Sequence, residues 1–287
     1  MPLDYDRLMA LPPFATRQTL THRDVILYAL GLGVGAEAPT DANELQYLLE
    51  DRLKALPSFA AVMGYPGFWL RDAKYGLRWE KILAAEQSVE IHETLPVSGV
   101  FEGETKIDAI YDKGPDKGAL IYATRPIRDL HSGRIVATVR QASLARADGG
   151  FGGSSEGAPK PAQTPSRAAD AIVAARTRPD QALIYRLSGD TNPLHADPEV
   201  ARSVGFSRPI FHGLGTFGVV ARALLKAVCG DEPERVRRID ARYSAPVLPG
   251  DELAIEIWRY GEDGRAAFRA SVGDVVVLQN GMMEFDR

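Results

Sequence analysis

Alternating apolar and polar positions divide the chain into two similar halves. In residues 251–261, Leu253, Ile255 and Ile257 alternate with polar or small residues, which is the period of a half-buried strand. Other runs are rich in Val, Ile and aromatic residues and are bounded by Gly, Asp or Pro. They predict further strands at 238–247, 265–273 and 274–285 in the second half, and at 88–97, 99–114, 118–130 and 133–145 in the first.

Helix-like apolar runs precede the strands of each half. RDVILYALG (23–31) and QALIYRLSG (181–189) each carry a central tyrosine and end in glycine, and an apolar helical run follows at 209–228. One helix and four or five antiparallel strands per half predict an α+β fold. A helix wrapped by a curved sheet would bury both the apolar run and one strand face.

The shared features occur in the same order at nearly the same offset. Tyr28 and Tyr185 are separated by 157 positions, and Pro96 and Pro246, in similar strand segments, by 150. A duplicated module explains both spacings. Chance similarity of short apolar stretches is the alternative.

A stretch of linker composition separates the halves. Residues 148–166, DGGFGGSSEGAPKPAQTPS, are dominated by Gly, Ser, Pro and Ala and have no periodicity. We therefore expect an N-terminal module at 1–147, a linker at 148–166 and a C-terminal module at 167–287.

Composition narrows the class of protein. The 287 residues are 45% hydrophobic and 25% charged, as in globular proteins, and the net charge of −4 gives no basic field for nucleic acid. The single cysteine, Cys229, excludes an intramolecular disulfide and fits a buried thiol in a reducing compartment. No signal peptide, membrane span or peroxisomal address is evident, so we expect a cytoplasmic protein without a membrane span.

Candidate chemistry is concentrated in residues 185–213. Gly189 would end the helical run, which leaves Asp190 just beyond the helix, and Asn192 with the following proline forms a turn before His195. A carboxylate and an imidazole brought together around one turn can move protons at neutral pH. The alternative is a capping turn beside a histidine that is merely satisfied by its surroundings.

A second element follows in the same segment. His212 and Gly213 lie at the start of the apolar helical run, where free N–H groups and the helix dipole favour a developing negative oxygen. Gly213 has no Cβ, so a carbonyl could approach its N–H closely. Alternatively, Gly213, Gly215 and Gly218 only let the helix pack tightly. The first half has no comparable motif.

Other chemistries fit the residues less well. His195, Asp197 and His212 lack the spacing of the usual zinc motifs, so we expect no metal. No G-x-S-x-G elbow surrounds Ser188, which argues against a covalent serine mechanism. The glycines of GGFGG are not framed by a strand and a helix, so they predict no dinucleotide site.

The segment YRLSGDTNPLHADPEVARSVGFSRPIFHGL (185–214) closely resembles the signature of the MaoC-like, or hydratase 2, family, with the core GDTNPLH intact. The first half resembles the longer members of that family in RDVILYALGLG, ELQYLLE, LPSFAAV, EQSVEIHETLPVSG and GGFGG. The resemblance implies a double hot-dog fold whose degenerate first module makes room for the acyl chain. It also implies a homodimer and an acyl-CoA substrate.

The activity implied by the resemblance is reversible addition of water to a trans-2-enoyl-CoA, which gives an (R)-3-hydroxyacyl-CoA without a cofactor. Asp190 and His195 match the catalytic pair, Asn192 the residue that orders the site, and Gly213 the glycine of the oxyanion hole. His212 is a candidate substrate contact, and Arg208 a candidate contact for a CoA phosphate.

Related activities remain open from the sequence. The substrate could be a branched, dicarboxylic or carrier-protein-bound 3-hydroxyacyl thioester that the enzyme dehydrates. Two further candidates are a non-catalytic acyl-CoA-binding partner and a hot-dog thioesterase. The intact set of Asp190, Asn192 and His195 argues against a purely binding role.

Overall fold

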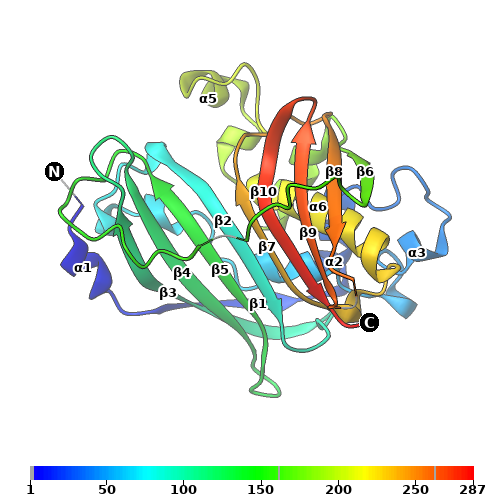
Figure 1. Ribbon diagram of the computed structural model, residues 1–287. Coiled ribbons are helices and arrows are strands. Elements are labelled where there is room, and N and C mark those ends of the chain that lie inside the picture. The colour runs from blue at the N-terminus through cyan, green and yellow to red at the C-terminus, as the bar shows by residue number, and fades with distance from the viewer. Residues whose placement is uncertain (1–2, 161, 262) are drawn as a thin grey trace.

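One ten-stranded antiparallel sheet forms the frame of the molecule (Figure 1). The computed structural model describes residues 3–160, 162–261 and 263–287. In chain order the strands are β1 (Phe14–Leu20), β2 (Ile82–Ile91), β3 (Gly99–Asp112), β4 (Ala119–Asp129), β5 (Ile135–Ala145), β6 (Ala171–Arg176), β7 (Val236–Tyr243), β8 (Glu252–Arg259), β9 (Arg265–Val272) and β10 (Val275–Phe285).

The strand order confirms the predicted duplication. Across the sheet the strands run β1-β3-β4-β5-β2 in the first half and, from the opposite edge, β6-β8-β9-β10-β7 in the second. Each half therefore places its first, third, fourth, fifth and second strands side by side. The halves meet where β2 pairs with β7, with Glu86–Glu90 opposite Arg242–Arg238. The α+β double-module architecture is confirmed.

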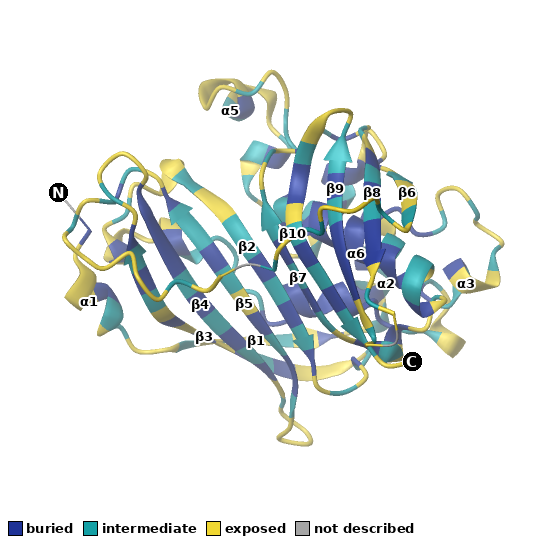
Figure 2. Cartoon of the chain, viewed as in Figure 1, coloured by how far each residue is buried: buried dark blue, intermediate teal, exposed yellow. Residues whose placement is uncertain are grey.

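The second half wraps its sheet around one long helix. α6 (Gly213–Cys229) packs on β6, β7, β8 and β10, and its buried face includes Phe217, Leu224 and Leu225. Leu253 and Ile255 of β8 are fully buried, as their alternation predicted. Figure 2 shows buried positions along α6 and along the strands, whereas α5 (Pro198–Ser203) is exposed on most of its surface.

The two helices with a central tyrosine pack on each other, and the long helix wrapped by the second-half sheet is a different one. α2 (His22–Gly31) and α4 (Gln181–Tyr185), which η6 (Arg186–Ser188) extends, pack on each other, with the rings of Tyr28 and Tyr185 5.8 Å apart. The helix wrapped by the second-half sheet is α6 instead. The remaining helical segments are short: α1 (Tyr5–Met9), α3 (Ala42–Leu45), η1 (Glu50–Arg52), η2 (Pro57–Val62), η3 (Trp69–Arg71), η4 (Ala73–Tyr75), η5 (Trp79–Lys81), η7 (Pro193–His195) and η8 (Pro233–Arg235).

The strand predictions missed both edge strands and misplaced two inner ones: the strand predicted at 88–97 is β2, which ends at Ile91, and the one predicted at 238–247 is β7, which ends at Tyr243. The edge strands β1 and β6 were not predicted, and β2 begins at Ile82 rather than at residue 88. Edge strands are half-exposed, and β1 and β6 therefore carry few large apolar residues. The early part of β2 contains small and polar residues and a register shift between Ala84 and Glu86.

The glycine-rich segment after β5 packs on the first half before the chain becomes exposed. The backbone N–H groups of Gly150, Gly152 and Gly153 donate to the carboxylate of Asp112, and the ring of Phe151 stacks on Tyr5 at 5.8 Å. The backbone of these glycines therefore binds the Asp112 carboxylate within the fold. Among the described residues, no helix has the length and hydropathy needed to cross a bilayer.

Candidate active site

The turn after α4 and η6 brings Asp190 and His195 together. Gly189 ends the helical run in the left-handed region at φ 113°, which a residue with a Cβ rarely adopts. The Asp190 carboxylate accepts the N–H of Asn192 at 3.2 Å, and the Asn192 side chain accepts the N–H of Leu194 at 3.1 Å. Asn192 thus fixes the turn that starts η7, at whose end lies His195.

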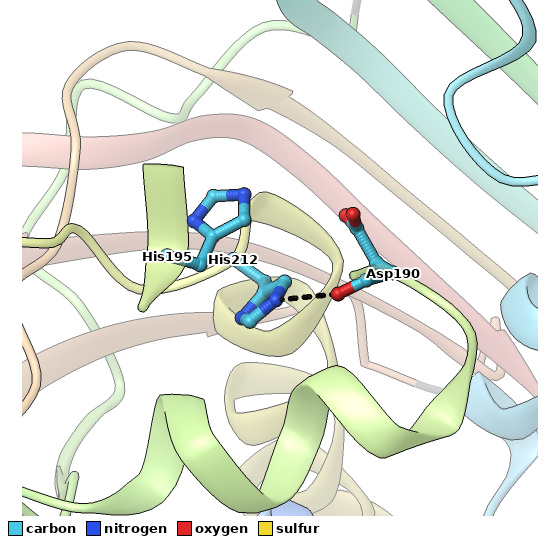
Figure 3. A group of neighbouring side chains, drawn as sticks. All are labelled: Asp190, His195 and His212. Atoms are coloured by element: carbon cyan, nitrogen blue, oxygen red, sulfur yellow. Dashed lines mark hydrogen bonds between the residues drawn. The ribbon is translucent and has the colours of Figure 1, made fainter. Parts of the chain in front are cut away.

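The tautomer of His195 is set by the backbone. Its Nδ1 lies 2.9 Å from the carbonyl oxygen of Ile210, and because a carbonyl only accepts, Nδ1 carries the hydrogen. The lone pair of Nε2 is therefore available, and Figure 3 shows Nε2 turned toward the Asp190 carboxylate. His195 is 8% exposed, so a small part of it stays accessible.

His212 lies beneath this pair as a buried support. Its ring stacks on His195 with the ring centroids 3.8 Å apart, and its Nε2 donates to the backbone carbonyl of Asp190 at 3.1 Å (Figure 3). The side chain has no exposed surface. One ring therefore fixes both the position of the Asp190 backbone and the plane of His195.

Burial keeps both imidazoles neutral. Desolvation lowers the pKa of His195, although the charge of Asp190 and the bond to Ile210 oppose that shift. Desolvation, followed by the neighbouring His195, lowers the pKa of His212 to about 2. At neutral pH the site therefore holds two neutral imidazoles beside a carboxyl group.

Gly213 begins α6 directly after His212. The first N–H groups of a helix have no intrahelical partner, and the positive end of the helix dipole lies there. A Cβ at Gly213 would lie 3.4 Å from the ring of Tyr243 and 3.8 Å from Ala84, which is ordinary van der Waals contact with both halves of the chain. An amide at such a helix start can polarise a carbonyl oxygen.

A cavity of about 750 Å³ joins these groups to the first half of the chain. Asp190, Asn192, His195 and Gly213 line it on the side of the second half, together with Tyr243. The first half contributes its opposite wall, which includes Tyr65, Phe68, Gln87, Gln141, Ser143, Lys117 and Arg146. The site is therefore shared between the two modules.

Asp190, His195 and His212 also form a group that could bind a metal ion, since one ligand atom of each lies within 4.8 Å of the others. However, Nδ1 of His195 and Nε2 of His212 each bond a backbone carbonyl, and the second nitrogen of His212 faces away from Asp190 (Figure 3). Joint ligation would break the bond that supports Asp190. The donor set therefore suits proton transfer better than metal binding.

Comparison with known proteins identifies the family. Residues 160–280 match the model of the MaoC like domain, and residues 18–147 match that of the MFE-2 hydratase 2 N-terminal domain. The chain is 38% identical over 272 residues to 3-hydroxyacyl-thioester dehydratase Y of Mycobacterium tuberculosis, with 92% of each chain covered. The chain belongs to the MaoC-like hydratase family. It is an enzyme of the hydro-lyase class, with hydratase or dehydratase activity.

Other MaoC-like proteins agree with this assignment. Peroxisomal enoyl-CoA hydratase 2 of Arabidopsis thaliana is 34% identical over 271 residues, which cover 89% of this chain and 87% of that protein. The crystal structure of a MaoC-like dehydratase from Phytophthora capsici is 33% identical and superimposes with a TM-score of 0.85 over 98% of both chains. The fold is thus the double hot-dog of these MaoC-like dehydratases.

Some of the predicted site residues line the cavity and others do not. Asp190, Asn192, His195 and Gly213 line the same cavity of this MaoC-like fold. His212 adjoins them but lies behind the cavity wall, and Arg208 is exposed and outside the lining. The substrate contact expected of His212 stays a prediction.

No pattern in the sequence indicated the wall that the first half contributes. Tyr65 follows an irregular segment, and Gln87 and Gln141 lie on the inner faces of β2 and β5, where they hydrogen-bond to each other at 3.3 Å. A glutamine inside a strand carries no local motif, whether it is buried like Gln87 or half-buried like Gln141. Their approach to Asp190 depends on how β2 and β7 join the halves.

Proposed function

We propose that the enzyme catalyses the reversible hydration of a trans-2-enoyl-CoA to an (R)-3-hydroxyacyl-CoA. The observation that supports this most is the position of the free His195 Nε2 beside the Asp190 carboxylate at the wall of a cavity that the Gly213 amide also lines. Proton transfer and a carbonyl-polarising group are thereby combined in one site.

In the proposed reaction, the thioester oxygen accepts the N–H of Gly213, which makes C3 electrophilic. Asp190 and His195 hold the water, and one of them accepts its proton as the oxygen attacks C3. A proton is delivered to C2, and the pair returns to its original protonation state. No electrons are exchanged with a cofactor, so no redox group is needed. Dehydration of a 3-hydroxyacyl thioester is the same path in reverse.

We further propose distinct roles for the two modules. The C-terminal module, 167–287, carries the acid–base pair, and the N-terminal module, 1–147, has no Asp–His motif and provides space for the acyl chain. Residues 148–166 connect them. The expectations of a homodimer and of a cytoplasmic location stand as part of this proposal, to be tested by sedimentation and by cell fractionation.

The deciding experiment follows the loss of conjugated enoyl-thioester absorbance with a series of trans-2-enoyl-CoAs. We expect the wild type to form the (R)-3-hydroxy product, as shown by chiral analysis. Asp190→Asn and His195→Gln should each lower kcat by about 10²–10⁴-fold because each removes one member of the acid–base pair. Asp197→Asn, in the same segment but at the exposed start of α5, is the matched control, since Asn also caps helices.

Two results would contradict the proposal. Release of free CoA thiol would indicate a thioesterase. Binding of acyl-CoA without turnover at any chain length would indicate a binding protein, and the roles of Asp190 and His195 would be withdrawn.

A further inference from the structure

A second, smaller cavity adjoins the turn that carries Asp190. It measures about 210 Å³ and is lined from both halves, by Thr16 and Gln18 of β1, Leu27 of α2, Phe59 and Val62 of η2, and Leu187 of η6 among others. Tyr65 is the one described residue that lines both this cavity and the large one. The two cavities therefore adjoin each other at Tyr65.

The two cavities also adjoin each other at the catalytic turn. Gly189 lines the small cavity and the next residue, Asp190, lines the large one. A Cβ at Gly189 would lie 3.8 Å from the Tyr65 ring, so the ring reaches the turn that carries the catalytic carboxylate. The wall between the cavities thus consists of the Tyr65 ring and the backbone at Gly189 and Asp190. A substitution can remove the ring but not the backbone.

The fold holds the Tyr65 ring firmly. The preceding Gly64 has a left-handed φ of 54°, donates its N–H to the Gln18 side chain at 2.8 Å, and has no room for a Cβ because Gly103 N would lie 2.7 Å away. On β4, the buried guanidinium of Arg125 lies 5.3 Å from the centre of the Tyr65 ring and donates to the carbonyl of Ala61 at 2.6 Å. A cation facing an aromatic ring in a desolvated site is strongly attracted to it.

The position and the lining of the small cavity indicate which kind of ligand it could bind. In the proposed function, the reacting carbons of a substrate lie between Asp190, His195 and Gly213. Tyr65 lines the same cavity, and its ring lies against the turn that carries Asp190. Leu27, Phe59, Val62 and Leu187 offer apolar surface in the small cavity. Polar and charged groups also line it, from Thr16, Arg17, Gln18, Asp24 and Ser188. A hydrocarbon chain with a branch or polar end suits this mixed lining.

We propose that the small cavity is a distal acyl subsite and that Tyr65 closes it, so that the Tyr65 ring sets the upper limit of acyl length in this enzyme. This inference rests on the proposed function, because it assigns the acyl end of the substrate to the same site. Removal of the ring is expected to join the two cavities and to admit longer or branched chains.

The test compares kcat/KM across straight-chain trans-2-enoyl-CoAs for the wild type, Tyr65→Phe and Tyr65→Ala. Burial of one more methylene raises affinity roughly fourfold. For substrates two methylenes beyond the wild-type limit, we expect Tyr65→Ala to raise the ratio of long-chain to short-chain kcat/KM at least roughly tenfold. Tyr65→Phe keeps the ring and should keep the wild-type length preference, whatever its absolute rate.

A second variant checks that the gain comes from the small cavity. Val62 lines that cavity and does not line the large one, so Val62→Phe introduced into Tyr65→Ala should fill the opened space and restore the short-chain preference. Thermal unfolding of each variant shows whether it is folded. An unchanged length preference in folded Tyr65→Ala, or an equal shift in Tyr65→Phe, would overturn the proposal.

A binding measurement tests the distal subsite independently of the proposed hydratase activity. Unreactive saturated acyl-CoAs of increasing length are titrated by calorimetry into wild type and Tyr65→Ala. The proposal expects tighter binding of long chains by the variant even if its chemistry is impaired, because Tyr65 adjoins Asp190. An identical length dependence would refute the distal subsite, whereas a wild type inactive on every enoyl-CoA would refute the hydratase proposal instead.

Discussion

At the scale of single residues, some groups of the site come from one short segment of the sequence, and others come together only through the fold. Asp190, Asn192 and His195 lie within six residues of each other, so the turn alone brings them together. The motif also indicated their chemistry. The buried position of His212 could not be predicted, because it depends on the packing of α6 against the catalytic turn.

The two buried histidines make stability depend on pH. His212 has a pKa of about 2 in the folded protein against an ordinary value of 6.5, and that of His195 is also lowered. Below pH 6.5 the unfolded chain binds protons that the folded protein does not. The free energy of unfolding should therefore fall as pH decreases from 6.5, by up to about 1.4 kcal/mol per pH unit for each histidine.

Urea unfolding at pH 7.5, 6.5 and 5.5 measures this slope. His212→Gln removes one titrating group but keeps an N–H donor for the Asp190 carbonyl, so we expect its acid slope to be smaller than that of the wild type by about one proton. His131→Gln, at an exposed turn, is the control. Equal slopes in the wild type and His212→Gln would show that His212 is not the group responsible.

At the scale of elements, the glycines of α6 have separable roles. A Cβ at Gly218 would lie 2.7 Å from Leu32 and 3.0 Å from the hydroxyl of Tyr28, whereas a Cβ at Gly213 meets nothing closer than 3.4 Å. Gly218 is therefore required by packing against α2. Packing does not require a glycine at position 213, which agrees with the proposed role of its amide.

We expect Gly218→Ala to lower the free energy of unfolding by about 1–3 kcal/mol through overpacking, although alanine favours helices. Gly213→Ala should remain as stable as the wild type, within about 1 kcal/mol, and lose at least tenfold in kcat/KM because the methyl group obstructs approach to the amide. Denaturant unfolding and the hydration assay measure both. Full activity in Gly213→Ala would rule out the amide as the carbonyl-polarising group.

Prediction of elements from the sequence succeeded where burial imposes a clear period. β8 alternates because one face packs on α6, and most central strands were predicted to within a few residues. The edge strands β1 and β6 were missed because half-exposed strands need few apolar residues. The segment that carries Tyr65 has no period at all, since its path follows Gly64, Gln18 and Gly103 from separate parts of the chain.

At the scale of the whole molecule, the two halves behave as one unit. Glu86 on β2 pairs with Arg242 on β7 at 2.6 Å and also accepts the hydroxyl of Tyr122 at 3.1 Å. The main hydrophobic core contains residues of both halves, and so does the wall of the large cavity. The halves are thus joined by the sheet, the core and the active site, in addition to the connecting segment.

This arrangement predicts that the connecting segment is dispensable for activity once the protein has folded. Residues 152–160 are mostly exposed, and a protease site placed there should allow complete cleavage. We expect the two fragments to elute together in gel filtration and to keep most of the hydratase activity. Each fragment expressed alone should be inactive, because it would carry only one wall of the cavity and an uncovered strand, β2 or β7. Separation of the cleaved fragments without denaturant would mean that the covalent connection, rather than the β2–β7 pairing and the shared core, holds the active site together.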